Sequence, residues 1–448
     1  MKRLLASLLL FFCAAAHAQQ EIRFWHAMSG SLGNALDTLI TRFNESQAEV
    51  RVVPEHKGSY EDTLIEALKA QKAGGGPDLV QVYEVGTANM MAARSAYRPL
   101  WQLAAEQHLA LDAKLFVPAA ASYFSDASGR LLALPFNLST PILFYNKDAF
   151  RRAKLDPEKP PATWYEMAKT MGELSDANFP CIYTTTWPSW IQIENMSVWH
   201  NQDFATRENG MDGPDAKLMF NTHLMVRHVS MLASWARSGY FTYSGRRLEG
   251  EKRFASGECA MLTAASSSSA DLRRLAKFDF GVAQLPYYDD IRGAPHHSLI
   301  GGAGLWAMAG RKPAEYRALG KFLAWLMRPE VQAEWHERTG YVPVTQAAYE
   351  YARKQGYYDV HPGQRIAIAQ LLLHSPTRES RGIRLGDFEQ VRAILEEELE
   401  AAWNGTVPPK LALDRAAERG NEVLRRFERA NHGGAEPATP KRAPRRKK

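Results

Sequence analysis

Apolar residues near the start of the chain recur first at strand spacing and then at helical spacing. The segments EIRFWHAM, VRVVP and DLVQVYE read as strands, and a helix separates each from the next. The second of these helices spans Tyr60–Lys72. Such alternation predicts an α/β fold with a parallel sheet covered by helices, in which ligand sites lie beyond the carboxyl ends of the strands. The first helix has its apolar face at Leu32, Leu36, Leu39, Ile40 and Phe43.

Residues 297–350 carry the clearest pattern of the chain. An apolar strand contains Gly301 and Gly302, a second helix begins at Pro329, and a turn spans Gly340–Pro343. A glycine pair inside an apolar strand indicates that some group comes too close to leave room for a Cβ, and that group can be a neighbouring strand or a ligand. The helix between the strand and the turn has its apolar face at Leu319, Phe322, Leu323 and Leu326.

The length of the chain predicts two lobes, because about 430 residues exceed what one hydrophobic core usually holds. The segment Leu132–Asn146 passes through Pro135 from one apolar strand to another without a crossover helix, which is typical of a crossing between lobes. Further helices are predicted over Thr163–Leu174, Leu218–Arg237, Phe388–Trp403 and Leu411–Arg429. The predicted boundaries are 19–136 with 279–326 for lobe 1, and 137–278 with 327–432 for lobe 2.

The N-terminus predicts export. Lys2 and Arg3 precede an apolar run that ends in small residues, so residues 1–18 read as a cleavable secretory signal peptide. No later segment reaches the ~20 uninterrupted apolar residues of a membrane span. We therefore expect a soluble protein of the periplasm.

Charge and cysteine content change this picture little. The formal net charge is +6, but six cations lie in the terminal segment 433–448, which is typical of a solvated, disordered basic tail and gives no indication of nucleic-acid binding. Cys181 and Cys259 remain after processing. An oxidising compartment permits one disulfide between them, and buried free thiols are an equal alternative.

Common catalytic and cofactor motifs are missing from the sequence. Gly302–Ala307 matches a relaxed dinucleotide fingerprint, yet it continues a strand instead of opening a helix. There is no P-loop, no G-x-S-x-G and no H-E-x-x-H, and His223 and His228 are five residues apart, which does not suit two ligands on one helical face. We therefore expect no enzyme activity, no metal and no cofactor.

The remaining chemistry is that of binding. Trp187 and Trp190 lie close together in a Thr-rich loop, a pattern typical of sites that hold polyols, although core packing is an alternative. Glu84 directly follows an apolar strand and can accept hydrogen bonds from hydroxyls, or it can form a surface ion pair. Arg392 lies on the apolar side of its helix, where a guanidinium suits a phosphate, a carboxylate or a structural salt bridge.

Several of these segments together resemble a known family. The segments are FWHAMSGSLG, QVYEVGTANMMAA, LPFNLSTPILFYNKDAF, WIQIEN, GECAM, IGGAGLWAM, EWH-x-x-TGY and ERGNEVLRRFE. They resemble the periplasmic glycerol-3-phosphate-binding proteins of ATP-binding-cassette importers, within the larger cluster of sugar-binding proteins. The resemblance implies a type II, maltose-binding-protein-like clamp with three interlobe crossings, acting as a monomer that delivers its ligand to inner-membrane permease subunits.

The resemblance also implies a set of ligand contacts. Where the family has a serine after the GECAM strand, this chain has Ala265 followed by Ser266, so either Ser266 replaces that serine or one phosphate donor is lost. The other implied contacts are Tyr60, Glu84, Ser139, Gly302, Tyr341 and Arg392, with Trp187 and Trp190 as a wall.

Glycerol phosphate has one end that needs acceptors and an anionic end that needs donors. We expect Glu84 at the first end, because a carboxylate beside phosphate would repel it, and Arg392, Ser266 and the backbone near Gly302 at the second. Glycerophosphodiesters such as glycerophosphocholine fit the same groups, with a quaternary ammonium near the Trp pair. The alternatives are a receptor for a neutral oligosaccharide and an exported glycerophosphodiester hydrolase.

Overall fold

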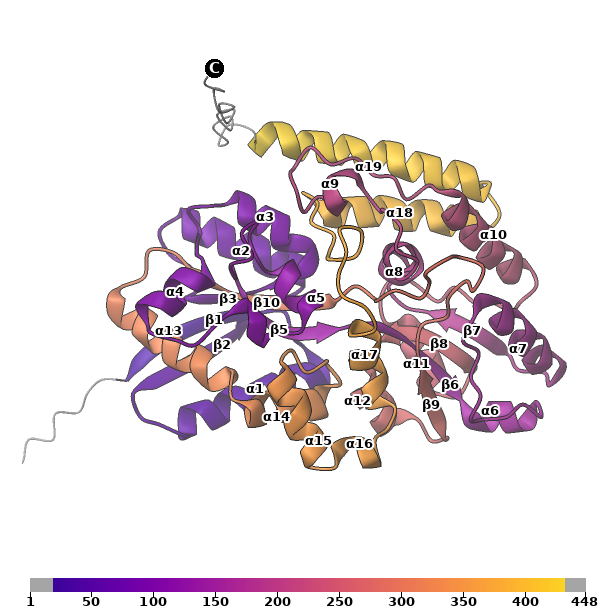
Figure 1. Ribbon diagram of the computed structural model, residues 1–448, viewed down its shortest axis with the longest axis horizontal. Coiled ribbons are helices and arrows are strands. Elements are labelled where there is room, and N and C mark those ends of the chain that lie inside the picture. The colour runs from indigo at the N-terminus through magenta and orange to yellow at the C-terminus, as the bar shows by residue number, and fades with distance from the viewer. Residues whose placement is uncertain (1–18, 432–448) are drawn as a thin grey trace, which may run out of the picture.

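The computed structural model describes residues 19–431 and contains two β-sheets, each covered by helices (Figure 1). The predicted signal peptide (1–18) and basic tail (433–448) lie outside the described residues. Within the described part of the chain, no helix has both the length and the apolar character needed to cross a membrane.

The first sheet has the strand order β2-β1-β3-β10-β4, and β5 also pairs with β10. The pairs β1–β2 and β1–β3 are parallel as predicted, whereas β10 runs antiparallel to each of its neighbours. Its strands are β1 (Gln20–His26), β2 (Val50–His56), β3 (Leu79–Tyr83), β4 (Tyr97–Arg98), β5 (Leu134–Ser139) and β10 (Gly301–Met308). The elements that accompany it are α1 (Gly30–Glu45), α2 (Tyr60–Lys72), η1 (Glu84–Gly86), α3 (Thr87–Ala92), α4 (Leu100–Glu106), η2 (Ala113–Leu115), α5 (Pro118–Tyr123) and α13 (Pro313–Leu326).

The second sheet has the strand order β7-β8-β6-β9. Its strands are β6 (Pro141–Asn146), β7 (Cys181–Thr185), β8 (Cys259–Ala265) and β9 (Phe280–Ala283). The helices near it are α6 (Lys147–Arg152), α7 (Trp164–Asp176), η3 (Trp190–Glu194), α8 (Asn195–Trp199), α9 (Thr206–Asn209), α10 (His223–Arg237), α11 (Glu249–Ala255) and α12 (Ser268–Leu275). The C-terminal helices are α14 (Pro329–Thr339), α15 (Gln346–Lys354), α16 (Tyr357–Val360), α17 (Gln364–Leu371), α18 (Phe388–Trp403) and α19 (Pro409–Asn431).

Local sequence explains where several helices begin. Ser59 and Asp62 form a reciprocal capping box at the start of α2, and Thr163 and Glu166 form another at the start of α7. The predicted bounds of α2 and α18 match the structure. The helix expected from Leu218 begins later, at His223, because Thr222 caps it.

A disulfide joins Cys181 and Cys259, which lie opposite each other in the parallel strands β7 and β8. The sequence left this pairing open. Since 78 residues separate the two cysteines, the bridge ties together distant parts of the second lobe.

The chain passes from the first sheet to the second at Thr140, between β5 and β6 and within the segment Leu132–Asn146 that the sequence predicts as a crossing. Pro135 lies inside β5, next to the point where the β5–β10 register shifts. β5 belongs to the first sheet and spans the predicted boundary after residue 136, whereas β9 lies in the range predicted for lobe 1 but pairs in the second sheet. We propose that lobe 1 extends to Ser139 and that the chain returns to it shortly before Gly301.

Candidate functional site

A buried arginine and two carboxylates lie at the centre of the candidate site. Arg392 on α18 donates from Nε and Nη2 to the two oxygens of Glu194, at 2.7 Å each, and from Nη2 to Glu84 Oε1 at 3.1 Å. Glu84 follows β3, and Glu194 ends the turn η3. The exposed fractions are 8% for Arg392, 8% for Glu84 and 1% for Glu194. These three hydrogen bonds within the described residues use Nε and Nη2, so the donors of Nη1 remain for another partner.

The electrostatics of this centre follow from burial and charge together. Burial raises the pKa of the Glu84 carboxyl, and the nearby Arg392 opposes that rise. Burial alone would lower the pKa of Arg392, but Glu194 and Glu84 outweigh it and hold the pKa well above its ordinary value. Arg392 is therefore permanently charged, and two carboxylates offset its single positive charge.

The sequence predicts Glu84 and Arg392 at opposite ends of a ligand, and these roles stay a prediction. In this structure the two side chains are in contact. The backbone N–H of Gly302 donates to Glu84 Oε2 at 3.0 Å, whereas the sequence predicts this N–H on the side of the guanidinium. A buried guanidinium and a buried carboxylate pair because each offsets the desolvation of the other.

Tyrosines and an amide form a second group beside Glu84. Asn137 on β5 donates to the Tyr60 hydroxyl at 2.9 Å and accepts from Gln81 at 2.8 Å. Tyr341 lies close to Tyr60 and Asn137, and burial raises the pKa of the Tyr60 and Tyr341 phenols. Tyr60 also stacks on Tyr83, with ring centroids 5.4 Å apart. These groups present hydroxyl and amide dipoles from β5, α2 and the turn after α14.

The tryptophan pair differs from the loop that the sequence predicts. Trp190 opens the π-helical turn η3 and is 5% exposed, while Trp187 packs partly buried against the same cluster. A π-turn inside a helical segment is frequent at functional sites. Trp187 holds Arg247 over its ring at 4.9 Å. The two indoles are therefore less exposed than expected, and their role as a wall of the site stays a prediction.

The glycine pair is explained by protein neighbours. A Cβ on Gly301 would lie 2.6 Å from the Trp190 ring, and one on Gly302 would lie 1.9 Å from the carbonyl oxygen of Asn137. Gly302 also has φ +106, which favours glycine. Close packing therefore accounts for the missing side chains, and the role of Gly302 as a ligand contact stays a prediction.

The serines lie where the lobes join. Ser139 pairs with Gly301 at the end of β5, and the neighbouring Thr140 exchanges backbone contacts with Ser266: the Ser266 N–H donates to the Thr140 carbonyl at 2.9 Å, and the Thr140 N–H donates to Ser266 Oγ at 3.4 Å. Ala265 remains the last residue of β8, beside the Trp190 cluster. Ser266 therefore adjoins the crossing but occupies a different position from Ala265.

A second ring of charges surrounds the centre. Arg247 bridges Glu396 and Glu389 on α18, at 3.1 Å each, and Ser189 donates to Glu396 at 3.2 Å. These bonds connect the Trp187–Trp190 segment to α18.

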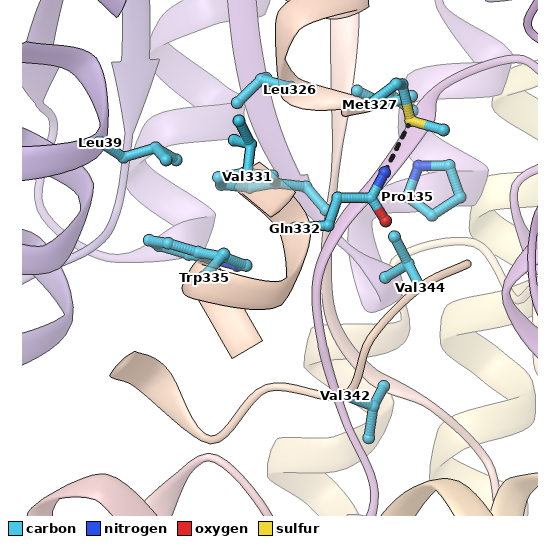
Figure 2. Close-up of a pocket in the computed structure, with 11 residues that line it drawn as sticks. Leu39, Pro135, Leu326, Met327, Val331, Gln332, Trp335, Val342 and Val344 are labelled. Atoms are coloured by element: carbon cyan, nitrogen blue, oxygen red, sulfur yellow. Dashed lines mark hydrogen bonds between the residues drawn. The ribbon is translucent and has the colours of Figure 1, made fainter. Parts of the chain in front are cut away.

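A hollow of about 140 Å³ lies between the segment after β3 and the start of α18, lined by residues that include Val85 and Glu389. A smaller apolar cavity of about 20 Å³ lies between α14 and β5, and Figure 2 shows residues that line it, among them Leu39, Val331 and Trp335. This is roughly the room of one water molecule, too small for a glycerol phosphate. Trp335 stacks on both Phe136 and Tyr341, so the cavity backs onto the Tyr341 wall. Among residues 19–431, no three His, Cys, Asp or Glu side chains are arranged to hold a metal ion.

Sequence reasoning missed Glu194 and Asn137. Glu194 lies in the quoted segment WIQIEN, where one carboxylate in an otherwise apolar run was the available signal. Asn137 lies in an apolar strand and gave a similar signal. Both are buried and bonded to predicted site residues.

Comparisons with known proteins agree with the two-lobed arrangement. The chain is 46% identical over 426 residues to the sn-glycerol-3-phosphate-binding periplasmic protein UgpB of Yersinia pseudotuberculosis, covering 95% of this chain and 97% of that protein. It is 47% identical, with the same coverage, to UgpB of Salmonella paratyphi A. Both proteins are relatives to which this chain is similar.

Solved structures show the same fold. UgpB from Mycobacterium tuberculosis in complex with glycerophosphocholine matches with a TM-score of 0.73 at 23% identity, covering 91% of this chain and 99% of that one. The cyclic alpha-maltosyl-1,6-maltose binding protein of Arthrobacter globiformis matches with a TM-score of 0.73 at 22% identity, covering 91% of this chain and 100% of that one. The family profile of bacterial extracellular solute-binding proteins matches residues 38–357. The chain therefore belongs to the bacterial extracellular solute-binding protein family.

Proposed function

We propose that this protein captures sn-glycerol 3-phosphate and glycerophosphodiesters such as glycerophosphocholine between its lobes and delivers them to the membrane permease of an ATP-binding-cassette importer. The observation that carries the proposal is Arg392, a buried guanidinium between the lobes in a chain 46% identical to glycerol-3-phosphate-binding proteins. The extracytoplasmic setting follows from the family, and the cleavable signal peptide, the periplasm and the monomeric state are part of the proposal.

The charged and the polar groups contact different parts of the ligand. Nη1 of Arg392 supplies donors to a phosphate oxygen, and a guanidinium suits that geometry. Glu84, Tyr60, Tyr341 and Asn137 supply acceptors and donors to the glycerol hydroxyls. Trp187 and Trp190 add flat apolar area to the wall. These groups come from both lobes, so hinge closure would bring them onto one ligand, with no chemical step by the protein.

Tryptophan fluorescence of residues 19–448 tests this proposal. Glycerol 3-phosphate and glycerophosphocholine are expected to change the emission of Trp187 and Trp190 in a saturable way, whereas maltose leaves it unchanged. A response to maltose alone would favour the neutral oligosaccharide receptor. Release of choline from the diester by the pure protein would favour the hydrolase.

A further inference from the structure

The turn η3 carries two groups of the candidate site on a backbone that is unfavourable by itself. Trp190 opens the turn, and Glu194 closes it and accepts both hydrogen bonds of its pair with Arg392. π-helical turns are rare, and Trp187, shortly before this one, has φ +44, a conformation that side chains seldom adopt. Such a backbone persists only where its surroundings hold it, so the contacts inside the turn decide where Glu194 lies.

Gln192, at the middle of the turn, is buried and uses both ends of its side-chain amide. Its Nε2 donates to the Tyr183 hydroxyl and to Thr185 Oγ1 at 2.9 Å each, and to Thr263 Oγ1 at 3.1 Å. These three hydroxyls come from the neighbouring strands β7 and β8. On the other side, Gln192 Oε1 faces His228 Nε2 on α10 at 3.0 Å. The amide therefore ties the turn to the second sheet and to α10 at the same time.

The hydrogen bonds also assign the tautomer of His228. An amide oxygen can only accept, so His228 Nε2 carries the proton and donates to Gln192. His228 Nδ1 then accepts from the Tyr288 hydroxyl at 3.2 Å. Burial lowers the pKa of His228 well below its ordinary value, so the imidazole stays neutral. A chain of buried hydrogen bonds thus runs in one direction from Tyr288 through His228 to Gln192.

We propose that His228 is a positioning residue of the ligand site, which fixes the turn η3 through Gln192 and thereby places Glu194 against Arg392. The inference rests on the proposed function, because its main readout is the binding of a phosphate ligand. Without the His228 donor, Gln192 Oε1 is buried without a partner, and the amide turns or the backbone shifts to satisfy it. A shift of the turn moves Glu194 and releases the guanidinium of Arg392 from the orientation in which it meets a phosphate.

Two substitutions of His228 separate the donor from the bulk of the side chain. His228→Leu keeps a buried side chain without a donor, whereas His228→Gln keeps an N–H that can reach Gln192. In calorimetry at pH 7, His228→Leu is expected to bind glycerol 3-phosphate roughly tenfold more weakly, and His228→Gln to stay within about twofold of the unmodified protein. Leu232→Ala is the matched control, because Leu232 is buried on the same helix. This control should lower thermal stability and leave the affinity unchanged.

Nitrogen NMR of the histidine-labelled protein reads the tautomer without any ligand. The ring of His228 is expected to show a protonated Nε2 and an unprotonated Nδ1, and the signal is assigned by its loss in His228→Gln. Tyr288→Phe removes the hydroxyl that holds Nδ1 and keeps the aromatic ring, so it tests the chain even if His228→Leu fails to fold. In this variant the two tautomers should mix, and the affinity for glycerol 3-phosphate should fall roughly threefold.

The other outcomes separate the inference from the proposed function. A loss of affinity in His228→Leu no larger than in Leu232→Ala would overturn the inference and leave the proposed function standing. Equally weak binding by His228→Leu and His228→Gln would do the same, because the donor to Gln192 would then not be the cause. A protonated Nδ1 in the unmodified protein, or unchanged affinity in Tyr288→Phe with mixed tautomers, would also overturn it. If the unmodified protein bound neither glycerol 3-phosphate nor glycerophosphocholine, the proposed function itself would fall.

Discussion

Asn89 and Asp387 exchange two hydrogen bonds across the junction of the lobes. Asn89 Nδ2 donates to Asp387 Oδ1 at 2.7 Å, and the backbone N–H of Asp387 donates to Asn89 Oδ1 at 3.0 Å. Asn89 lies on α3 beside the first sheet, and Asp387 caps α18, which packs on α19 (Figure 1). This pair joins the segment after Glu84 to the helix of Arg392.

Removal of this pair is expected to weaken ligand binding. Two hydrogen bonds contribute about 1–2 kcal/mol, so Asn89→Ala should lower affinity for the ligand roughly tenfold by destabilising the arrangement that brings the lobes together. Calorimetry measures the affinity and thermal unfolding checks the fold. Asn34→Ala, at an exposed position of α1, serves as the control. Unchanged affinity in the Asn89 variant would show that the pair does not contribute to closure.

Replacement of Arg392 should affect stability as well as binding. Arg392→Ala leaves Glu84 and Glu194 buried without a counter-charge, so the free energy of unfolding should fall by about 3–5 kcal/mol. Urea unfolding measures this loss. Adding Glu194→Gln should recover part of it, because one of the uncompensated charges is removed.

Arg353→Ala is the control for this series, since Arg353 is 53% exposed and its partner Glu350 is 36% exposed, and such surface pairs contribute about 1 kcal/mol or less. A loss in Arg392→Ala no larger than in the control would contradict the account of a buried, charge-coupled centre.

Local sequence patterns predict the helices and strands better than they predict the contacts between them. The bounds of α2 follow from its capping box and those of α18 from its apolar spacing, which are local signals. The contact of Arg392 with Glu194 joins positions 198 residues apart, and no periodicity encodes it. The sequence predicts Trp190 in a loop, whereas in the structure it opens a π-helical turn. The spacing of apolar residues in an α-helix does not reveal such a turn. Arg392 on an apolar helix face did indicate a buried guanidinium, although not its partners.

Glu251 should make stability depend on pH in a defined direction. Its pKa rises from 4.5 to about 7 on burial, so between these values the folded chain keeps a proton that the unfolded chain releases. Stability from this group is complete below pH 4.5 and is lost as the pH rises to about 7. Unfolding from pH 4.5 to 8 should show the protein losing about 3 kcal/mol relative to Glu251→Gln. Parallel curves for the two proteins would contradict this assignment.

Ala265 should limit affinity for a phosphate. Ala265→Ser adds a hydroxyl at the end of β8, beside Trp190, and one further hydrogen bond corresponds to roughly two- to tenfold in affinity. Calorimetry with glycerol 3-phosphate should show this gain, and glycerol, which lacks the phosphate, should show none. An equal gain for both ligands would indicate that the hydroxyl acts through packing and not through the phosphate.

Calorimetric titration of residues 19–448 with glycerol 3-phosphate, glycerophosphocholine, glycerol and maltose tests the central claim most directly. The account predicts saturable one-site binding of at least one phosphate ligand, with no measurable binding of maltose and with loss of the phosphate binding in Arg392→Lys, whose point charge replaces the planar guanidinium. Binding of maltose with none of either phosphate would contradict it.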